Sequence, residues 1–511
     1  MTRKLWILLL GALMLFATAC GKSDNGGSGS QGGASGSQSQ SGSTDANRNE
    51  PVVNLAVAYY ITGAYPSDLE EVQNEINKIT REKINAEVTL VPIAGGDYPQ
   101  KSNLMLVGNE KLDLLITGMR FDFVTKATSG QLLPLDDLIE QHGSGIAEVL
   151  GPELLRSGSV GGQSYAIPTM RDMAGANALY MRKDLVDKYQ IDVSSIKTWD
   201  DAEKVLHLVK QNEPDMYPLV PYGPVPQTTV TQWFDPLGDK FGVLPLSGDG
   251  QTIVNLFETQ EYADFVNRMR RWYEDGLVLT DYATTNETRA NLLRANLGFA
   301  YLAPDKPGGV EMESKAAGME IVGAVIDDPI TTTFNAQNIM WAIPRNSQAP
   351  EKAMQLLNLM YTDERLVNLL NWGIEGKHYV KVGDNVVKYP DGLDVNTVGF
   401  NQASVGFQFG NQFLSYVLEG EDPEMWKKLK QFANNAKKSP ALGFTFDNTN
   451  VKSEVAAVNA VYSHYGRGLE GGTLDPEEAL PAMISEMKAA GIDKIIAEKQ
   501  RQFDEFLKTK K

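Results

Sequence analysis

The order of apolar segments at the start of the globular part limits the chain to few folds. Residues 54–60 (NLAVAYY) and 87–93 (EVTLVPI) read as strands, and between them a helix begins at the capping box Ser67-x-x-Glu70. A helix over 98–107 then precedes a third strand at 111–116 (KLDLLI). Strands that alternate with helices predict a parallel sheet with right-handed crossovers, so the fold class is α/β.

Two loops of this predicted sheet have the composition of a binding site. Ligands of open α/β sheets bind beyond the carboxyl ends of the strands. Here those ends lead into residues 59–63 (YYITG) and 117–121 (TGMRF), which combine glycine with aromatic, hydroxyl or charged side chains. For either loop alone, the alternative is a connection without a binding role.

The rest of the body continues with strands, hairpins and helices. Hairpins are expected at 243–255, around Gly248-Asp249-Gly250, and at 379–389. A strand is expected at 338–343, and the pattern is helical from Pro423 onward, ending in a helix at 492–507.

Charge and residue usage argue against several function classes. The chain has 47 Lys and Arg against 65 Asp and Glu, a formal charge of −18, which repels the phosphates of nucleic acids. Its 4 His are far apart in sequence, and its 1 Cys forms neither an internal disulfide nor a cysteine cluster. Because P-loop, nucleophile-elbow and complete EF-hand patterns are missing from the sequence, we expect no cofactor, no metal site and no enzymatic activity.

The first twenty residues read as an export signal. Arg3 and Lys4 precede an apolar run over residues 5–16, which is shorter than the roughly 20 residues of a membrane-spanning helix. The small residues Ala17-Thr18-Ala19 lead directly to Cys20, an arrangement that resembles the lipobox of bacterial lipoproteins, although Ala17 stands where Leu is usual. We therefore expect residues 1–20 to be a lipoprotein signal peptide and Cys20 to be lipidated. An ordinary cleaved signal with a coincidental cysteine is the alternative.

A tether follows the cysteine. Residues 21–50 contain 8 Gly and 8 Ser, without any aromatic residue, Leu, Ile or Val. Such a segment cannot offset the entropy of ordering and is expected to be disordered, with a root-mean-square reach of about 30 Å.

Four segments of the body carry a resemblance to a known family. They are, in order, GGQSYAIPTMRD, LYMRKDLVDKYQIDVSSIKTWDDAEKVL, LLRANLGFAYL and IMWAIPRNSQAPEKAMQLLNLMYTDE. Together they resemble the family-1, carbohydrate-type extracellular solute-binding proteins of bacterial ABC importers. The segments NWGIEGKHYVKV and DKIIAEKQRQFDEFL are similar to the long LplA-type lipoproteins of Gram-positive bacilli, whose additional C-terminal region is uncharacterised.

The resemblance implies a two-lobed periplasmic-binding-protein-like (type II) fold, with hinge strands between the lobes and a helical C-terminal region. The first lobe would comprise residues 51–168 and be completed by about 325–371. The second lobe would comprise residues 169–324. Residues 372–511 would form the C-terminal region, with a hairpin and helices that pack on the lobes.

The function implied is delivery of a carbohydrate, an oligosaccharide, to an ABC transporter by hinged closure of the lobes. The 7 Trp, 19 Tyr and 18 Phe supply the flat apolar surfaces that sugar rings require. A binding protein for a peptide or other non-sugar solute is one alternative, and a secreted carbohydrate-active enzyme is another.

Positions that match the cleft-lining positions of the family give the expected ligand contacts. For any single Trp or Tyr among them, core packing is the alternative, and for Arg171-Asp172 the alternative is a surface ion pair. The expected ligand-binding residues are Tyr60, Thr62, Met119, Arg120, Arg171, Asp172, Trp233, Tyr301, Gln337, Asn338, Trp372 and Glu375.

The expected partners are the solute, the permease subunits of the transporter and the membrane, reached through the lipid anchor. We expect a monomer that binds no nucleic acid and lies at the outer face of the cytoplasmic membrane.

The anchor gives a direct test. Changing Cys20→Ser removes the thiol to which lipid is attached, so the protein should move from the membrane fraction to the soluble fraction. Two acyl chains suffice for stable attachment, whereas one gives only marginal binding. Cell fractionation and immunoblotting measure the distribution. A Cys20→Ser protein that still sediments with membranes would contradict lipidation.

Overall fold

The computed structural model describes residues 51–108, 110–222 and 233–510. The predicted signal peptide, Cys20 and the tether over residues 21–50 lie outside the described residues. None of the helices in the described ranges is long and apolar enough to cross a membrane.

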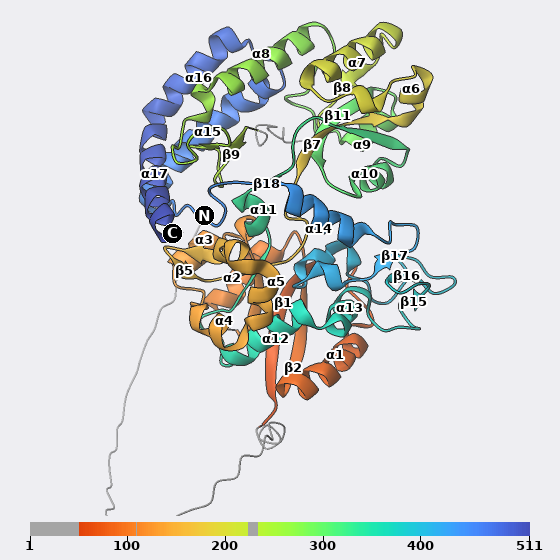
Figure 1. Ribbon diagram of the computed structural model, residues 1–511, viewed down its shortest axis with the longest axis vertical. Coiled ribbons are helices and arrows are strands. Elements are labelled where there is room, and N and C mark those ends of the chain that lie inside the picture. Colours follow the sequence, from red (N-terminus) through yellow and green to blue (C-terminus); the bar gives the residue numbers. More distant parts are fainter. Residues whose placement is uncertain (1–50, 109, 223–232, 511) are drawn as a thin grey trace, which may run out of the picture. The chain divides into compact units, whose positions relative to one another are not determined.

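The first sheet confirms the predicted parallel start of the fold (Figure 1). Its strand order is β2-β1-β3-β14-β6. β1 is parallel to β2 and β3, and β14 is antiparallel to β3 and β6. The strands are β1 (Val53–Ile61), β2 (Ala86–Ala94), β3 (Leu114–Thr117), β6 (Ile167–Pro168) and β14 (Met340–Ala342). β1 is buried from Leu55 to Ile61, as expected for a strand of a parallel sheet.

Among the described residues, seven α-helices accompany this sheet. They are α1 (Leu69–Ile84), α2 (Tyr98–Val107), α3 (Phe123–Thr128), α4 (Asp136–His142), α5 (Ser144–Leu155), α12 (Pro350–Thr362) and α13 (Glu364–Trp372). The predicted capping box of α1 is wrong, because the helix begins at Leu69. The hydroxyl of Ser67 instead contacts the carbonyl oxygen of Gly399 and the carboxylate of Asp68.

The second sheet has the strand order β12-β7-β11-β8. β7 is antiparallel to β11 and β12, and β11 is parallel to β8. The strands are β7 (Ala176–Arg182), β8 (Tyr217–Leu219), β11 (Gly298–Asp305) and β12 (Ile321–Val325). The accompanying helices are α6 (Lys183–Lys188), α7 (Trp199–Asn212), α8 (Gln260–Glu274), α9 (Arg289–Arg294) and α10 (Gly309–Ala317).

Each sheet has its own hydrophobic core, so the body has two lobes. Residues 169–175 and 326–339 connect the two sheets. Beside these two segments, residues 437–445 lead from α14 to the C-terminal helices. The second segment contains β13 (Ile330–Thr331) and α11 (Thr333–Gln337), and the third contains β18 (Lys437–Lys438). We refer to these three segments as the crossing segments.

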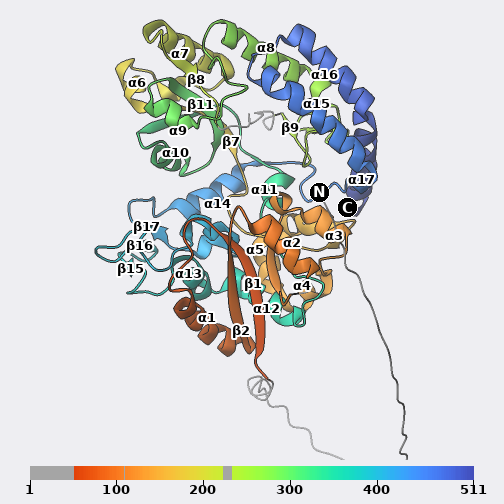
Figure 2. The same cartoon turned by 180° about the vertical axis from the view of Figure 1, so that it is seen from behind.

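The C-terminal region divides between the two cores. Residues 372–435 contain the predicted hairpin, formed by β15 (Val380–Lys381) and β16 (Val386–Lys388), followed by β17 (Val417–Leu418) and α14 (Met425–Asn435). Phe400, Val405 and Phe409 of this part belong to the first core. The helices α15 (Lys452–Glu470), α16 (Pro476–Ala490) and α17 (Ile492–Thr509) instead supply side chains to the second core. Both ribbon views show α15 and α16 beside α8 (Figures 1 and 2).

The hairpin predicted at 243–255 is replaced by a different pairing. β10 (Leu244–Pro245) pairs with β9 (Phe234–Asp235), and only the single bridge Val243–Val254 joins the two predicted arms. The Asp249 carboxylate accepts hydrogen bonds from the N–H groups of Gln251 and Thr252 and so closes a turn without a longer ladder. The hairpin of β4 (Ser159–Val160) and β5 (Gln163–Ser164) lies before β6.

Candidate functional site

Tyr60 lies near the carboxyl end of β1 and is the centre of an aromatic group. Its ring centroid is 5.5 Å from that of Phe121, 5.9 Å from that of Tyr98 and 6.5 Å from that of Phe407. The side chain is only 6% exposed, yet its hydroxyl has no hydrogen-bond partner among the described residues. Burial raises the pKa of this hydroxyl, and the nearby charges of Arg120 and Arg171 partly oppose the increase.

Arg171 and Asp172 lie in the first crossing segment. Nη1 of Arg171 is 2.7 Å from Oδ1 of Asp172, and Nη2 donates to the carbonyl oxygen of Asn335 at 3.2 Å. The guanidinium also lies 5.8 Å from the ring centroid of Phe407. Because the two side chains are only 12% and 16% exposed, the pair is largely buried and is not the surface pair considered as the alternative.

Asp172 joins this group to the second lobe. Its other carboxylate oxygen pairs with Nζ of Lys306, which directly follows β11. Burial raises the pKa of Asp172, but the charges and hydrogen bonds of Arg171 and Lys306 outweigh it and hold the pKa below the ordinary 3.8. A lowered pKa means that this pairing stabilises the folded protein above pH 3.8 and is lost as the pH falls through the lower, folded-state value.

We call Tyr60, Arg120, Arg171, Asp172, Lys306, Asn335 and Phe407 the crossover cluster. It combines guanidinium and ammonium donors with a carboxylate acceptor and aromatic rings. Such a set can hydrogen-bond hydroxyl groups and cover an apolar ring face. The cluster therefore suits a small polyhydroxylated molecule better than an extended apolar one.

The loop after β3 lies against the second crossing segment. Gly118 has φ of +132°, and a Cβ on it would lie 2.4 Å from the carbonyl oxygen of Asn338 and 2.7 Å from that of Gln337. Only glycine allows this backbone approach. The approach places the backbone just before Met119 and Arg120 against Gln337 and Asn338.

The strand expected at 338–343 begins only at Met340, because Gln337 is the last residue of α11 and Asn338 caps that helix. The buried amide of Gln337 donates to the carbonyl oxygen of Ser157 at 2.9 Å and to Oγ1 of Thr445 at 2.5 Å. Both of its amide hydrogens are therefore used within the protein, and Gln337 positions the crossing segment.

A small cavity of 160 Å³ lies beside this loop and receives residues from both lobes. Its lining includes Met119, Gly238, Gln337 and Phe444. The methyl group of Met119 lies 3.2 Å from the position that a Cβ on Gly238 would take. Met119 therefore contacts the second lobe directly.

Two further predicted residues lie at intermediate positions. Thr62 is exposed, and its Oγ1 lies 3.2 Å from Oγ of Ser404. Trp233 is half-buried and packs partly against the second core. Thr231 and Gln232, which precede it, lie outside the described residues.

Three other predicted residues also lie outside the crossover cluster. Tyr301 is fully buried, and its hydroxyl donates to Oε2 of Glu313 at 2.8 Å, so the side chain is occupied within the second lobe. Trp372 is 5% exposed and its indole N–H donates to Oγ of Ser415 at 3.1 Å. Glu375 is exposed at the start of the loop before β15.

Sequence reasoning missed Phe407, Asn335 and Lys306. Lys306 could have been found by the rule applied to β1 and β3, because it also follows the end of a strand. Phe407 and Asn335 carry no comparable signal, since only the folded chain brings them to Arg171.

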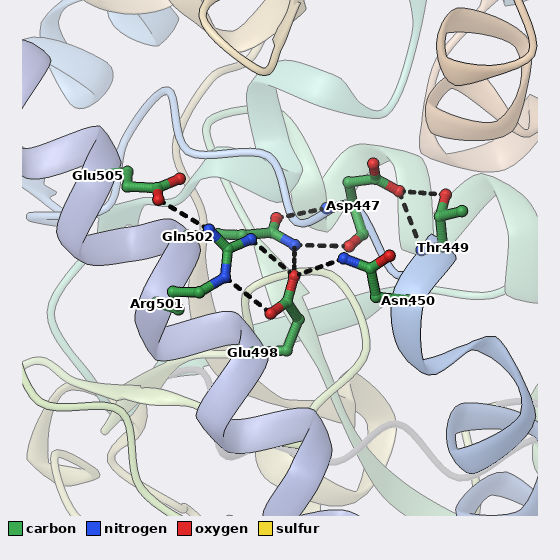
Figure 3. Close-up of polar contacts among 7 residues, drawn as sticks. All are labelled: Asp447, Thr449, Asn450, Glu498, Arg501, Gln502 and Glu505. Carbon is green, nitrogen blue, oxygen red and sulfur yellow. Dashed lines mark hydrogen bonds and ion pairs between the residues drawn. The ribbon is translucent and has the colours of Figure 1, made fainter.

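The part of the chain that the structure describes contains no group of three or more His, Cys, Asp and Glu that could hold a metal ion. The oxygen-rich segment at 447–450 closes its own turn. Oδ1 of Asp447 accepts from both the N–H and the hydroxyl of Thr449 (Figure 3).

Residues 63–365, more than half of the chain, match the family model described as bacterial extracellular solute-binding protein. The chain belongs to this family. The family is extracellular and consists of binding proteins. Residues 440–508 also match a domain of unknown function, DUF3502.

Two curated relatives match this chain along nearly their whole length. A carbohydrate ABC transporter substrate-binding protein of Streptococcus pneumoniae serotype 4 is 29% identical over 471 residues, which covers 91% of this chain and 92% of the relative. Lipoprotein LipO of Bacillus subtilis strain 168 is 22% identical over 517 residues, which covers 96% of this chain and 94% of the relative.

Solved structures give the same fold. The N-glycan transport solute-binding protein NgtS of Streptococcus pneumoniae matches with a TM-score of 0.77 and 28% identity, covering 90% of this chain and 100% of that one. Its complexes with Man1GlcNAc and Man5GlcNAc match with TM-scores of 0.68 and 0.65 over the same shares. The two-lobed α/β fold predicted from the sequence is thereby confirmed.

The unpartnered hydroxyl of Tyr60 gives a prediction for stability. Tyr60→Phe should leave the free energy of unfolding unchanged or raise it, because it removes a buried polar atom that forms no hydrogen bond. Tyr98→Phe is the matched control. There the hydroxyl accepts from the N–H of Ile116 at 2.8 Å, so its loss should cost about 1–3 kcal/mol.

Urea unfolding followed by circular dichroism measures both variants under the same conditions. If Tyr60→Phe lost as much stability as Tyr98→Phe, the Tyr60 hydroxyl would have a partner in the free protein.

Proposed function

We propose that this protein is a lipid-anchored extracellular solute-binding protein that delivers an oligosaccharide to an ABC transporter by hinged closure of its two lobes. The crossover cluster carries the proposal. In it, residues of the first lobe, the crossing segments and the second lobe meet around the Arg171–Asp172 pair.

The chemistry of the cluster supports a carbohydrate as the solute. Arg120 supplies an exposed guanidinium, and the buried Tyr60 supplies a hydroxyl that can both donate and accept. The rings of Tyr60 and Phe407 lie 6.5 Å apart and offer apolar surface. The family relationship points the same way, since the pneumococcal relatives are a carbohydrate substrate-binding protein and an N-glycan transport protein.

The three NgtS structures support a movement of the lobes. They represent one relative, yet the TM-score against this chain falls from 0.77 to 0.68 and 0.65 in the complexes with the two glycans. The structures of that relative therefore differ from one another in shape. A solute favours the closed form when only that form lets both lobes contact it.

The remaining parts of the proposal concern boundaries and attachment. We assign residues 51–168, completed by about 325–371, to the first lobe, residues 169–324 to the second lobe and residues 372–511 to the C-terminal region. Within the second lobe, Trp233 is the proposed stacking surface. Cys20 would hold the protein at the outer face of the cytoplasmic membrane beside the permease subunits, as the similarity to lipoprotein LipO suggests.

Calorimetric titration of the purified protein with neutral oligosaccharides tests this function. Arg171→Ala should weaken binding by roughly tenfold or more, because hydrogen bonds from charged groups contribute about 1.5–3 kcal/mol. Arg365→Ala is the matched control. Arg365 also lies close to an aspartate in sequence, at 3.4 Å from Asp363, but its side chain is 61% exposed and lies outside the crossover cluster.

The same samples distinguish the alternatives. A thermal shift by a peptide and by no oligosaccharide would indicate a peptide-binding protein. Release of shorter sugars during the titration would indicate an enzyme. Equal weakening by Arg171→Ala and Arg365→Ala would place the binding site elsewhere.

A further inference from the structure

A second, larger groove lies beside the β4–β5 hairpin. Its volume is 880 Å³, within the range of small-molecule sites in proteins. Four separate parts of the chain line it: the end of α3, the hairpin with its flanks, the loop at 443–450, and α17. We call it the hairpin groove. Two of these parts belong to the domain of unknown function at residues 440–508.

The lining of the hairpin groove has the composition of a sugar site. The half-buried ring of Phe506 lines the groove, and the ring of Phe444, only 4% exposed, lies beside it with the centroids 5.7 Å apart at an angle of 58°. Arg156, Gln163 and Tyr165 supply polar groups to the same lining. The guanidinium of Arg156 forms no hydrogen bond or ion pair with any residue that the structure describes, although its charge acts on Glu153 and Lys510, so its donors remain available to a ligand.

Charged side chains along α17 pair with one another on this wall (Figure 3). Arg501 contacts Glu498 at 2.8 Å and Glu505 at 2.7 Å. The side-chain hydrogen bonds of Arg501 and Gln502 lower the pKa of Glu498 to about 2, so this carboxylate stays charged.

A second set of bonds ties this wall to the loop at 443–450. The amide of Gln502 donates to the carbonyl oxygen of Asp447 at 2.7 Å and accepts from the N–H of Asp447 at 2.9 Å. Side chains held in this way lose little freedom when a ligand binds, which lowers the cost of binding.

The charges of the groove balance. Arg156 and Arg501 are matched by Asp447 and Glu505 among the lining residues. A balanced site does not select a strongly anionic or cationic ligand by its field. The groove therefore fits a neutral saccharide better than a polyuronate or a basic peptide.

The hairpin groove and the small cavity at Met119 share two walls, formed by α3 and by the loop at 443–450. Residues of α3 line both, with Phe123 beside Met119 and Thr128 in the groove. Phe444, in the loop at 443–450, also lines both. The two cavities therefore lie next to each other, on either side of Phe444 and along α3.

We propose that the hairpin groove is a second carbohydrate subsite that binds the outer residues of an extended neutral oligosaccharide. This inference rests on the proposed function and gives the C-terminal domain a role: it forms one wall of the subsite. Short oligosaccharides would contact only the crossover cluster, whereas long ones would also reach the groove.

Titration with Man1GlcNAc and Man5GlcNAc tests the inference, because the two probes differ in length. Wild-type protein should bind Man5GlcNAc more tightly. Arg156→Ala removes the available guanidinium, and Thr128→Trp fills the groove from an exposed position on α3. Each should reduce the affinity for Man5GlcNAc by roughly tenfold, while the affinity for Man1GlcNAc should change by less than about twofold.

Arg271→Ala and Lys78→Trp are the matched controls, because both residues are exposed and line neither cavity. Equal weakening of both glycans by the groove variants, or no weakening of either, would overturn the subsite. Equal wild-type affinity for the two glycans would overturn it as well. If the wild type bound neither glycan, the proposed function would fail for this class of sugar, and the inference would fall with it.

Discussion

Among the described residues, only the three crossing segments run between the two lobes, and they lie beside the binding residues. Backbone hydrogen bonds hold these segments to one another. Gly175 and Ile330 exchange two backbone bonds of 2.9 and 3.0 Å, and the N–H of Ser439 donates to the carbonyl oxygen of Thr331 at 2.9 Å. A narrow connection of this kind allows two cores to move as bodies while the segments bend. The binding residues on these segments, Arg171 and Asp172 among them, therefore lie where such a movement changes contacts most.

The buried ion pair illustrates this dependence. Taking charges out of water is costly, so a buried pair contributes little stability unless its geometry is good and further hydrogen bonds complete it. Asp172 satisfies this condition by contacting Arg171 on its own segment and Lys306 of the second lobe. Arg171 lies on a crossing segment and Lys306 in the second lobe. The interactions of Asp172 within the crossover cluster therefore depend on how the two lobes are arranged.

Much of the first lobe could be predicted because its strands have clear apolar patterns. β1 is a continuous apolar run, as burial on both faces requires, whereas the edge strand β2 alternates between buried and less buried residues. The importance of Arg171-Asp172 came from the resemblance of the surrounding segment to a family, and the structure adds which groups they contact. Phe407 could not be predicted, because its approach to Tyr60 depends on how the C-terminal region packs on the first lobe.

Two of the expected ligand residues, Tyr301 and Trp372, have side chains engaged within the protein. Position at the end of a strand does not state which way a side chain points. Tyr301 lies on β11, but its ring stacks on Tyr180 at 5.7 Å and its hydroxyl is taken by Glu313. Trp372 likewise has the residue type of a sugar platform, yet its indole is held by Ser415. Aromatic type and approximate place are visible in a sequence, whereas the face that a ring presents is decided by packing.

Small-angle X-ray scattering tests the central claim most directly, namely that one solute contacts both lobes and draws them together. The radius of gyration would be measured for wild-type protein alone and with a saturating oligosaccharide that calorimetry shows to bind. The account predicts a smaller radius with the solute. An unchanged radius at saturation would contradict it.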